Sequence, residues 1–293
     1  MKKIVLLTLF ISSLLFAQKE QISVNILPQK YFVEKIVQDK FEINVMVNPG
    51  SSPHNFEPKP SQMKSLAKSK IYFISGDNSE LAWIDRFKQN AKDTLFVDSV
   101  KDIVKIPMTE HHHHDEDAHH DHDAHDHEHD EDSLDPHTWL DPINVKTIAK
   151  NIYEAVILVD EKNRDFYENN YNKFLIELDN LDLELKNILE PYKNRAFMVF
   201  HPSWGYFAAR YNLNQIAVES QGKEPKPNEL VNLINEAKMH DIKVVFTSPQ
   251  FSKKAATVIS ENIKGNVEVI DPLSIDWENN LINTAKLIEK SYK

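Results

Sequence analysis

Residues 161–190 read EKNRDFYENNYNKFLIELDNLDLELKNILE, and Pro191 follows directly. The segment has no Gly or Pro, and its leucines recur at spacings of three, four or seven residues, which is typical of one buried helix face. The leucines in question are Leu175, Leu178, Leu185 and Leu189. The pattern predicts a single helix of about 45 Å at 1.5 Å per residue. Such a helix would join the regions on either side and limit their hinging; a coiled-coil dimer is the alternative.

On both sides of this helix, short β-branched or aromatic runs alternate with helical patterns, which favours parallel sheets covered by helices. Strands are expected at 22–27, 43–47, 71–75, 95–97, 196–200, 215–218, 244–247 and 267–270. Helices are expected at 31–38, 61–68, 79–90, 142–159, 204–211, 227–240, 253–263 and 277–290. The predicted fold is therefore α/β, with two lobes of about four parallel strands each, joined by the long rigid helix. The predicted lobes span residues 18–159 and 192–293, and the linking helix spans 160–191.

Residues 110–132 read EHHHHDEDAHHDHDAHDHEHDED, with ten histidines, eleven carboxylates and two alanines. The run has no apolar residue for a core, but it is rich in divalent-metal ligands, so it predicts an unstructured segment with several weak metal sites. A plain acidic loop and a purification tag are the alternatives, although an internal, irregular run is a poor tag. The ten histidines are His111, His112, His113, His114, His119, His120, His122, His125, His127 and His129.

The charge of the chain is concentrated in this run. The sequence has 34 basic and 45 acidic residues and a net charge of −11. Because the run contributes eleven acids and no base, the rest of the chain is balanced. A balanced body has no basic field to attract a phosphate backbone, which argues against nucleic acid as a partner.

The first 17 residues are typical of an export signal. Lys2 and Lys3 precede the apolar stretch 4–16, and Ala17 stands at a plausible cleavage point. Leu15 weakens the cleavage motif, so an uncleaved anchor is the alternative. No other stretch approaches the length of a membrane span. The sequence also contains no cysteine, which excludes disulfides, thiolate ligands and lipid attachment through an N-terminal Cys. We expect a soluble periplasmic protein.

Four histidines remain outside the run, and three of them stand in informative places. His201 and Asp271 each follow an expected strand directly, and His54 lies in a loop just past another. Ligand sites of open α/β sheets gather at the carboxyl ends of strands, so these residues predict a site in the cleft between lobes. His137, which closes the loop that carries the histidine run, could join His54.

Three imidazoles and one carboxylate would make a tetrahedral site for Zn²⁺. Each histidine could instead be an ordinary loop residue, and Asp271 before a proline could be a turn or cap residue. His240 ends a charged helix and is interpreted as a solvated side chain. Aromatic neighbours of the site, Trp139, Trp204 and Tyr206, are interpreted as packing residues.

Two classes of zinc protein can be weighed on these residues. A hydrolytic zinc enzyme can also use three histidines, but the sequence has no HExxH, no nucleophile elbow and no evident general base. We therefore expect no enzyme and no catalytic residues. A zinc storage protein or metallochaperone would use the histidine run as its whole function and would have no single tight site.

Five segments together are more specific than any single residue. They are NPGSSPHNFEPKPSQM (48–63), DPHTWLDP (135–142), KNRAFMVFHPSWGYFA (193–208), GKEPKPNEL (222–230) and VIDPLS (269–274). In this order around a long helix, they resemble the ZnuA-like zinc-binding periplasmic proteins of ABC transporters. The resemblance covers essentially the whole mature chain. One departure is the absence of the cysteine pair that some members use as a disulfide.

The resemblance implies a monomeric receptor that captures Zn²⁺ with high affinity and passes it to a zinc permease and, through it, its ATPase. Ligand positions of the family match His54, His137 and His201, and Asp271 matches a carboxylate whose direct coordination varies between members. Manganese and iron members resemble this chain but typically place a carboxylate where His201 stands. Imidazole in that place also favours zinc over manganese on chemical grounds, although copper would bind more tightly still.

Overall fold

A computed structural model describes residues 19–108, 134–219 and 223–293. The export signal predicted at 1–17 and the histidine-rich run predicted at 110–132 lie outside the described residues.

Two four-stranded sheets form the centres of the two lobes, with the orders β2-β1-β3-β4 and β6-β5-β7-β8. All neighbouring strands pair in parallel, so the predicted α/β fold with two parallel sheets is confirmed. The strands are β1 (Glu20–Val24), β2 (Phe41–Val45), β3 (Ser69–Ile74), β4 (Leu95–Asp98), β5 (Ala196–Val199), β6 (Asn214–Ala217), β7 (Val244–Thr247) and β8 (Asn266–Val269).

The helices follow the expected positions with two exceptions. The helices are α1 (Leu27–Val37), α2 (Pro60–Leu66), α3 (Asn78–Leu81), α4 (Ile84–Asn90), α5 (Pro142–Val159), α6 (Arg164–Leu189), α7 (Gly205–Arg210), α8 (Pro227–Met239), α9 (Lys254–Asn262) and α10 (Trp277–Ser291). Helix α1 begins at Leu27, four residues before the expected start, and the strand expected at 22–27 ends at Val24; the second exception is the helix expected at 79–90. The prediction of one helix over 79–90 is wrong, because two short helices replace it. The Glu80 side chain turns inward to bind the Ser75–Gly76 turn, which fixes α3 as a separate unit.

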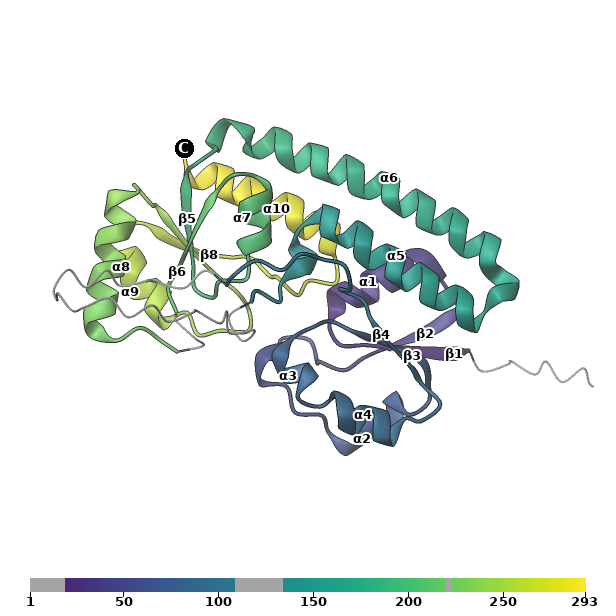
Figure 1. The fold of residues 1–293 in the computed structure, drawn as a ribbon. Coiled ribbons are helices and arrows are strands. Elements are labelled where there is room, and N and C mark those ends of the chain that lie inside the picture. Colours follow the sequence, from purple (N-terminus) through teal and green to yellow (C-terminus); the bar gives the residue numbers. More distant parts are fainter. Residues whose placement is uncertain (1–18, 109–133, 220–222) are drawn as a thin grey trace, which may run out of the picture.

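Helix α6 is the long helix expected from the sequence. It has 26 residues, or about 39 Å at 1.5 Å per residue, and short 3₁₀ turns flank it at 161–163 and 190–192. Figure 1 shows it running along both lobes, with α5 and α10 beneath it. Leu178, Leu185 and Leu189 are buried and Leu175 is half-buried. This face packs on α1, α5 and α10 of the same chain, so it is not free to form a coiled coil.

The apolar core has two parts. One cluster runs from the first sheet through α5 and α6 and continues to residues such as Phe197, Phe246 and Leu281 in the second lobe. A second cluster lies within the second lobe, where Val245 packs with α8 and α9 residues such as Leu233 and Ile259. The first sheet and part of the second lobe therefore share one core, whereas α8 and α9 cover a core of their own.

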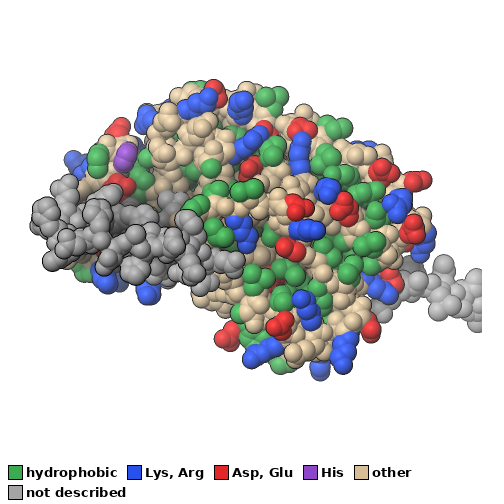
Figure 2. Space-filling view, viewed as in Figure 1, with side chains coloured by type: hydrophobic (Ala, Val, Ile, Leu, Met, Phe, Trp, Pro, Cys, Tyr) green, Lys and Arg blue, Asp and Glu red, His purple; other side chains and the backbone are tan. Residues whose placement is uncertain are grey.

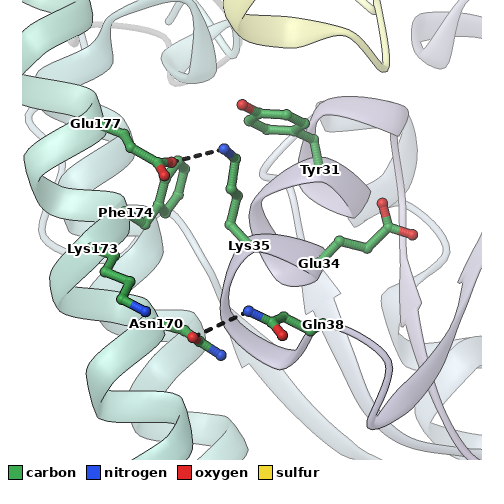
Figure 3. Close-up of a pocket in the computed structure, with 8 residues that line it drawn as sticks. All are labelled: Tyr31, Glu34, Lys35, Gln38, Asn170, Lys173, Phe174 and Glu177. Carbon is green, nitrogen blue, oxygen red and sulfur yellow. Dashed lines mark hydrogen bonds and ion pairs between the residues drawn. The ribbon is translucent and has the colours of Figure 1, made fainter.

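Polar contacts fasten α1 to α6 (Figure 3). The ammonium group of Lys35 lies 2.7 Å from Glu177 Oε2, and the amide of Gln38 donates to Asn170 Oδ1 at 3.2 Å. Asn170 in turn donates to the carbonyl of Ile36 at 3.0 Å. These residues line a surface groove of about 400 Å³. Its central charges are already paired and no histidine lines it, so this groove is a poor candidate for a metal site.

Two buried indoles connect the region before α5 to the second lobe. Trp139 Nε1 donates to the carbonyl of Pro272 at 2.8 Å, and Trp277 Nε1 donates to the carbonyl of Trp139 at 2.9 Å. Trp277 also packs edge-on against Phe32 of α1, with ring centroids 5.0 Å apart. The sequence predicted that Trp139 is a packing residue. Its indole N–H group also connects the region before α5 to the second lobe.

The visible surface carries acidic and basic side chains in alternation, without a large area of one sign (Figure 2). This agrees with the charge balance outside the histidine run. Among the helices of the described residues, none combines the length and the apolar character needed to cross a bilayer.

Candidate metal centre between the lobes

His54 comes from the first lobe. It lies in a 3₁₀ turn at 53–55, whose N-cap, Ser52, accepts a hydrogen bond from the His54 amide at 3.3 Å. The Ser79 hydroxyl donates to the carbonyl of His54. Its ring Nδ1 lies 2.6 Å from Oδ2 of Asp77, which follows β3. Ser52 of the same loop therefore holds the His54 amide, and the segment after β3 holds its carbonyl and its ring.

His137 comes from the segment between the first sheet and α5. Asp135 Oδ1 accepts hydrogen bonds from both the amide and the ring Nδ1 of His137, at 2.8 and 2.7 Å. Gly205, at the start of α7, leaves room for this carboxylate, because a Cβ at that position would lie 2.5 Å from Asp135 Oδ2. The hydroxyl of Tyr206 donates to the carbonyl of Asp135 at 3.0 Å. Two residues of the second lobe thus support His137.

His201 comes from the second lobe, directly past β5. Glu219 follows the neighbouring strand β6, and its Oε1 pairs with Nδ1 of His201. The ring of Phe251 stacks on the other imidazole face, with centroids 4.7 Å apart and planes 23° from parallel. Adjacency of β5 and β6 in the sheet therefore positions the pair.

The three imidazoles meet at one point. The Nε2 atoms of His54, His137 and His201 lie 3.0, 3.3 and 3.4 Å from one another, and the three residues form a group able to hold a metal ion. A tetrahedral zinc with Zn–N bonds of about 2.0–2.1 Å needs nitrogens about 3.3 Å apart. Each Nδ1 faces a carboxylate, which holds the proton there and leaves the Nε2 lone pair for a metal.

The electrostatic settings of these partners differ. Burial raises the pKa of Asp77, but the hydrogen bond from His54, its charge and the Ser79 amide together bring that pKa below its ordinary value. Burial raises the pKa of Glu219 to about 7, against the opposing charge of His54. Burial, with the neighbouring charges of His137 and His54, holds the pKa of His201 well below 6.5. His201 is therefore neutral at pH 7 and ready to bind a cation.

The turn that carries Asp77 has its own support. Glu80 Oε2 accepts hydrogen bonds from the amide and hydroxyl of Ser75 and from the Gly76 amide, at 2.8, 2.6 and 3.0 Å. Tyr72 donates to the other oxygen at 2.6 Å. Burial raises the pKa of Glu80 to about 7, although these hydrogen bonds oppose it. Gly76 has a φ of +83°, a backbone conformation that residues other than glycine rarely adopt.

Asp271 lies at the end of β8, as expected, but its carboxylate is not in the group formed by the three histidines. Its Oδ1 accepts hydrogen bonds from Gln250 Nε2 at 2.9 Å and from the Leu273 amide at 3.0 Å. His240 caps the end of α8 and is exposed, as expected.

Sequence reasoning missed the three carboxylates that orient the imidazoles. A signal for them was present, because Asp77 and Glu219 each stand a few residues past a strand, as His201 does, and Asp135 stands two residues before His137. Acidic residues are common in such loops, so the pattern alone selects too many candidates.

The chain is similar to several known proteins. The family described as "Zinc-uptake complex component A periplasmic" matches residues 22–290. The high-affinity zinc uptake system protein ZnuA of Bacillus subtilis (strain 168) is 28% identical over 250 residues, which cover 84% of this chain and 76% of that protein. The zinc-binding protein AdcA of Streptococcus pyogenes is 25% identical over 93% of this chain, which spans 56% of the length of AdcA.

Solved structures give the same result. A crystal structure of ZnuA has a TM-score of 0.84 and 37% identity, and the match covers 94% of this chain and 100% of that one. A ZnuA variant with residues 138–173 deleted, solved with zinc bound, has a TM-score of 0.82 and 37% identity over 93% and 98% of the two chains.

Proposed function

The chain belongs to the family of periplasmic zinc-uptake complex components A, and on that premise we propose that it captures Zn²⁺ in the periplasm and hands it to the permease of an ABC-type uptake system. Members of this family are transport receptors and not enzymes. The metal is accordingly cargo, and the protein's task is to bind it tightly, hold it away from competitors and release it to its partner.

The triangle of Nε2 atoms carries the proposal. Its edges of 3.0–3.4 Å suit a tetrahedral zinc ion, and we assign His54, His137 and His201 as the ligands. A carboxylate behind each imidazole raises its basicity and fixes its tautomer, as is usual for zinc-bound histidine.

The choice of zinc over manganese or iron rests on the donor atoms. Manganese sites prefer carboxylate and carbonyl oxygens, whereas the three assigned donors are imidazole nitrogens. A manganese or iron receptor, the main alternative within the family, would need oxygen donors among the ligands. Copper would bind this site more tightly than zinc, so the metal carried in the cell also depends on supply.

A calorimetric titration tests the ligand assignment. In a protein lacking residues 110–132, the triple variant His54→Ala, His137→Ala, His201→Ala should lose the single tight zinc equivalent. The matched control is His240→Ala, which removes an exposed histidine at the end of α8 and should keep it. A tight equivalent that persists in the triple variant would refute the assignment.

The histidine-rich run has a separate, secondary role in this proposal. We assign it several weak, exchangeable zinc sites, because flexible ligands lose entropy when they bind. The residues on either side of it already pair, since Pro107 and Leu134 form an antiparallel bridge and the Asp135 amide donates to the carbonyl of Ile106 at 2.9 Å. Deletion of 110–132 should therefore need little rearrangement, lower the zinc stoichiometry and spare the tight site. A storage protein would instead lose all of its zinc.

Delivery to the permease needs a test in cells. A strain without its own copy of this protein should grow under zinc limitation when it is given the wild type or His240→Ala, but not the triple variant. Added zinc should restore growth of all three strains. Full growth with the triple variant under limitation would contradict the receptor role.

A further inference from the structure

Four side chains stand in a row along the carboxyl edge of the second sheet. The strand order is β6-β5-β7-β8, and Glu219, His201, Gln250 and Asp271 follow these strands in that order. Neighbouring strands lie about 4.8 Å apart, so Asp271 starts about 10 Å to the side of His201. Gln250 stands between the carboxylate and the histidine.

Hydrogen bonds hold Asp271 on its own side. Its Oδ1 accepts from Gln250 Nε2 at 2.9 Å and from the Leu273 amide at 3.0 Å. Its main-chain carbonyl accepts from Asn280 Nδ2 at 2.7 Å. To reach a metal at the histidines, the carboxylate would have to give up both of its Oδ1 bonds.

Two cavities meet at Gln250. One, of about 10 Å³, is lined by the three histidines, and the other, of about 190 Å³, is lined by Asp271; Gln250 and Leu273 line both. The oxygen of the Gln250 amide is buried and has no hydrogen-bond partner among the described residues. The amide nitrogen is thus bonded to Asp271, and the unpaired oxygen belongs to a side chain that also lines the histidine cavity.

We propose that Gln250 determines the fourth ligand of the bound zinc: its N–H group holds Asp271 outside the coordination shell, and its oxygen accepts a hydrogen bond from a water molecule on the metal. This inference rests on the proposed function. A cavity of about 10–15 Å³ is enough for one water, and the histidine cavity has about this size. Phe251, stacked on His201, limits access from the second lobe.

The consequence is chemical. A shell of three imidazoles and water keeps the full double charge of zinc and retains one ligand that exchanges easily, whereas an entering carboxylate would neutralise part of that charge and close the shell. By keeping the Asp271 carboxylate out of the shell, the Gln250 amide keeps the site in the form from which zinc is released more easily.

Gln250→Met and Asp271→Asn separate the two functions of this amide. Methionine keeps the length of glutamine and removes both polar groups. The readouts are zinc affinity from competition with a chelator, and the visible spectrum of the Co²⁺-loaded protein, which reports coordination. Asp276→Asn, which removes a neighbouring exposed carboxylate, is the control for charge.

Asp271→Asn alone should leave the Co²⁺ spectrum unchanged and alter zinc affinity by less than about threefold, as Asp276→Asn should. Gln250→Met should change the spectrum, because the Asp271 carboxylate can then enter the shell in place of water. The double variant Gln250→Met, Asp271→Asn, which has neither the amide nor the carboxylate, should lower zinc affinity by about 10–100-fold, the usual range for an outer-sphere partner. In the Gln250→Met background, Asp271→Asn should change the spectrum again, because the released carboxylate can then reach the metal.

Two results would overturn the inference: a spectral change in Asp271→Asn alone, or a wild-type spectrum in Gln250→Met. Neither result would contradict the receptor proposal, because that proposal is tested separately by loss of the tight zinc site in the triple histidine variant.

Discussion

The two lobes have the same sheet order but hold their histidines in opposite electrostatic settings. In the first lobe, His54 is partly exposed and its partner Asp77 has a lowered pKa, so this carboxylate stays ionised. In the second lobe, His201 and Glu219 are both buried, the pKa of Glu219 is about 7 and that of His201 is well below 6.5. The first lobe offers charge to an approaching cation, and the second offers a dry, neutral ligand.

Loss of one imidazole should have the largest effect. His54→Ala and His201→Ala should each lower zinc affinity by more than about 100-fold, above the range for outer-sphere partners, because three nitrogens define the site. Competition with a chelator measures both. If only one variant lost affinity, the lobes would not share the metal.

Removing the charge behind His54 should have the next largest effect. At pH 6, Asp77→Asn should lower zinc affinity by about 10–100-fold, because an ionised partner is lost. Glu219→Gln should cost less at this pH, because Glu219 is largely protonated below its pKa of about 7. Equal losses would mean that the two partners do not differ in charge.

A pH profile examines the second lobe more closely. Zinc favours the ionised form of Glu219, so binding should release its proton at pH values below about 7. This linkage should lower the wild-type affinity by about tenfold per pH unit below that pKa. Glu219→Gln should remove this part of the slope and Asp77→Asn should keep it. Calorimetry in two buffers of different ionisation enthalpy counts the protons.

The same raised pKa affects folding of the zinc-free protein. Folded Glu219 keeps its proton up to about pH 7, whereas the unfolded side chain loses it near pH 4.5. The folded state therefore binds more protons between these values, and the contribution of Glu219 to the free energy of unfolding falls as the pH rises through this window. Urea unfolding at pH 5 and pH 8 should show a larger fall in the wild type than in Glu219→Gln, in which Glu80, whose pKa is also about 7, still contributes to the trend.

The smallest effect should come from the separate core of the second lobe. Ile259→Val should lower the free energy of unfolding by about 0.5–1.5 kcal/mol and leave zinc affinity unchanged, because Ile259 packs in the cluster under α8 and α9. Val231→Ala, on the exposed face of α8, should change neither the free energy of unfolding nor the zinc affinity. A loss of zinc affinity in Ile259→Val would mean that this cluster supports the site.

Much of this architecture could be predicted from the sequence, because local patterns determine it. The eight strands coincide with short runs that contain β-branched or aromatic residues, α6 has an uninterrupted leucine face, and His54, His137 and His201 stand where strands or their loops end. Membership of the zinc-receptor family, predicted from five segments, is confirmed. These features depend on residues that are close in the chain.

The position of Asp271 could not be predicted in the same way, because it depends on strand order. Asp271 and His201 both follow a strand directly, and the sequence does not say that β7 lies between β5 and β8. Pairing of Glu219 with His201 likewise requires β6 to lie beside β5. The break between α3 and α4 depends on where the Glu80 carboxylate binds, which is a tertiary contact.

The crossed indole bonds of Trp139 and Trp277 bear on how an ion enters and leaves. Both N–H groups are buried, and a buried donor without a partner costs about 1–3 kcal/mol. A hinge motion that separated the lobes at this point would break both hydrogen bonds together. Even a small opening would therefore cost the free energy of both bonds. Zn²⁺ should therefore enter and leave by movement of the loops that carry His54 and Phe251, while the two lobes keep their relative positions.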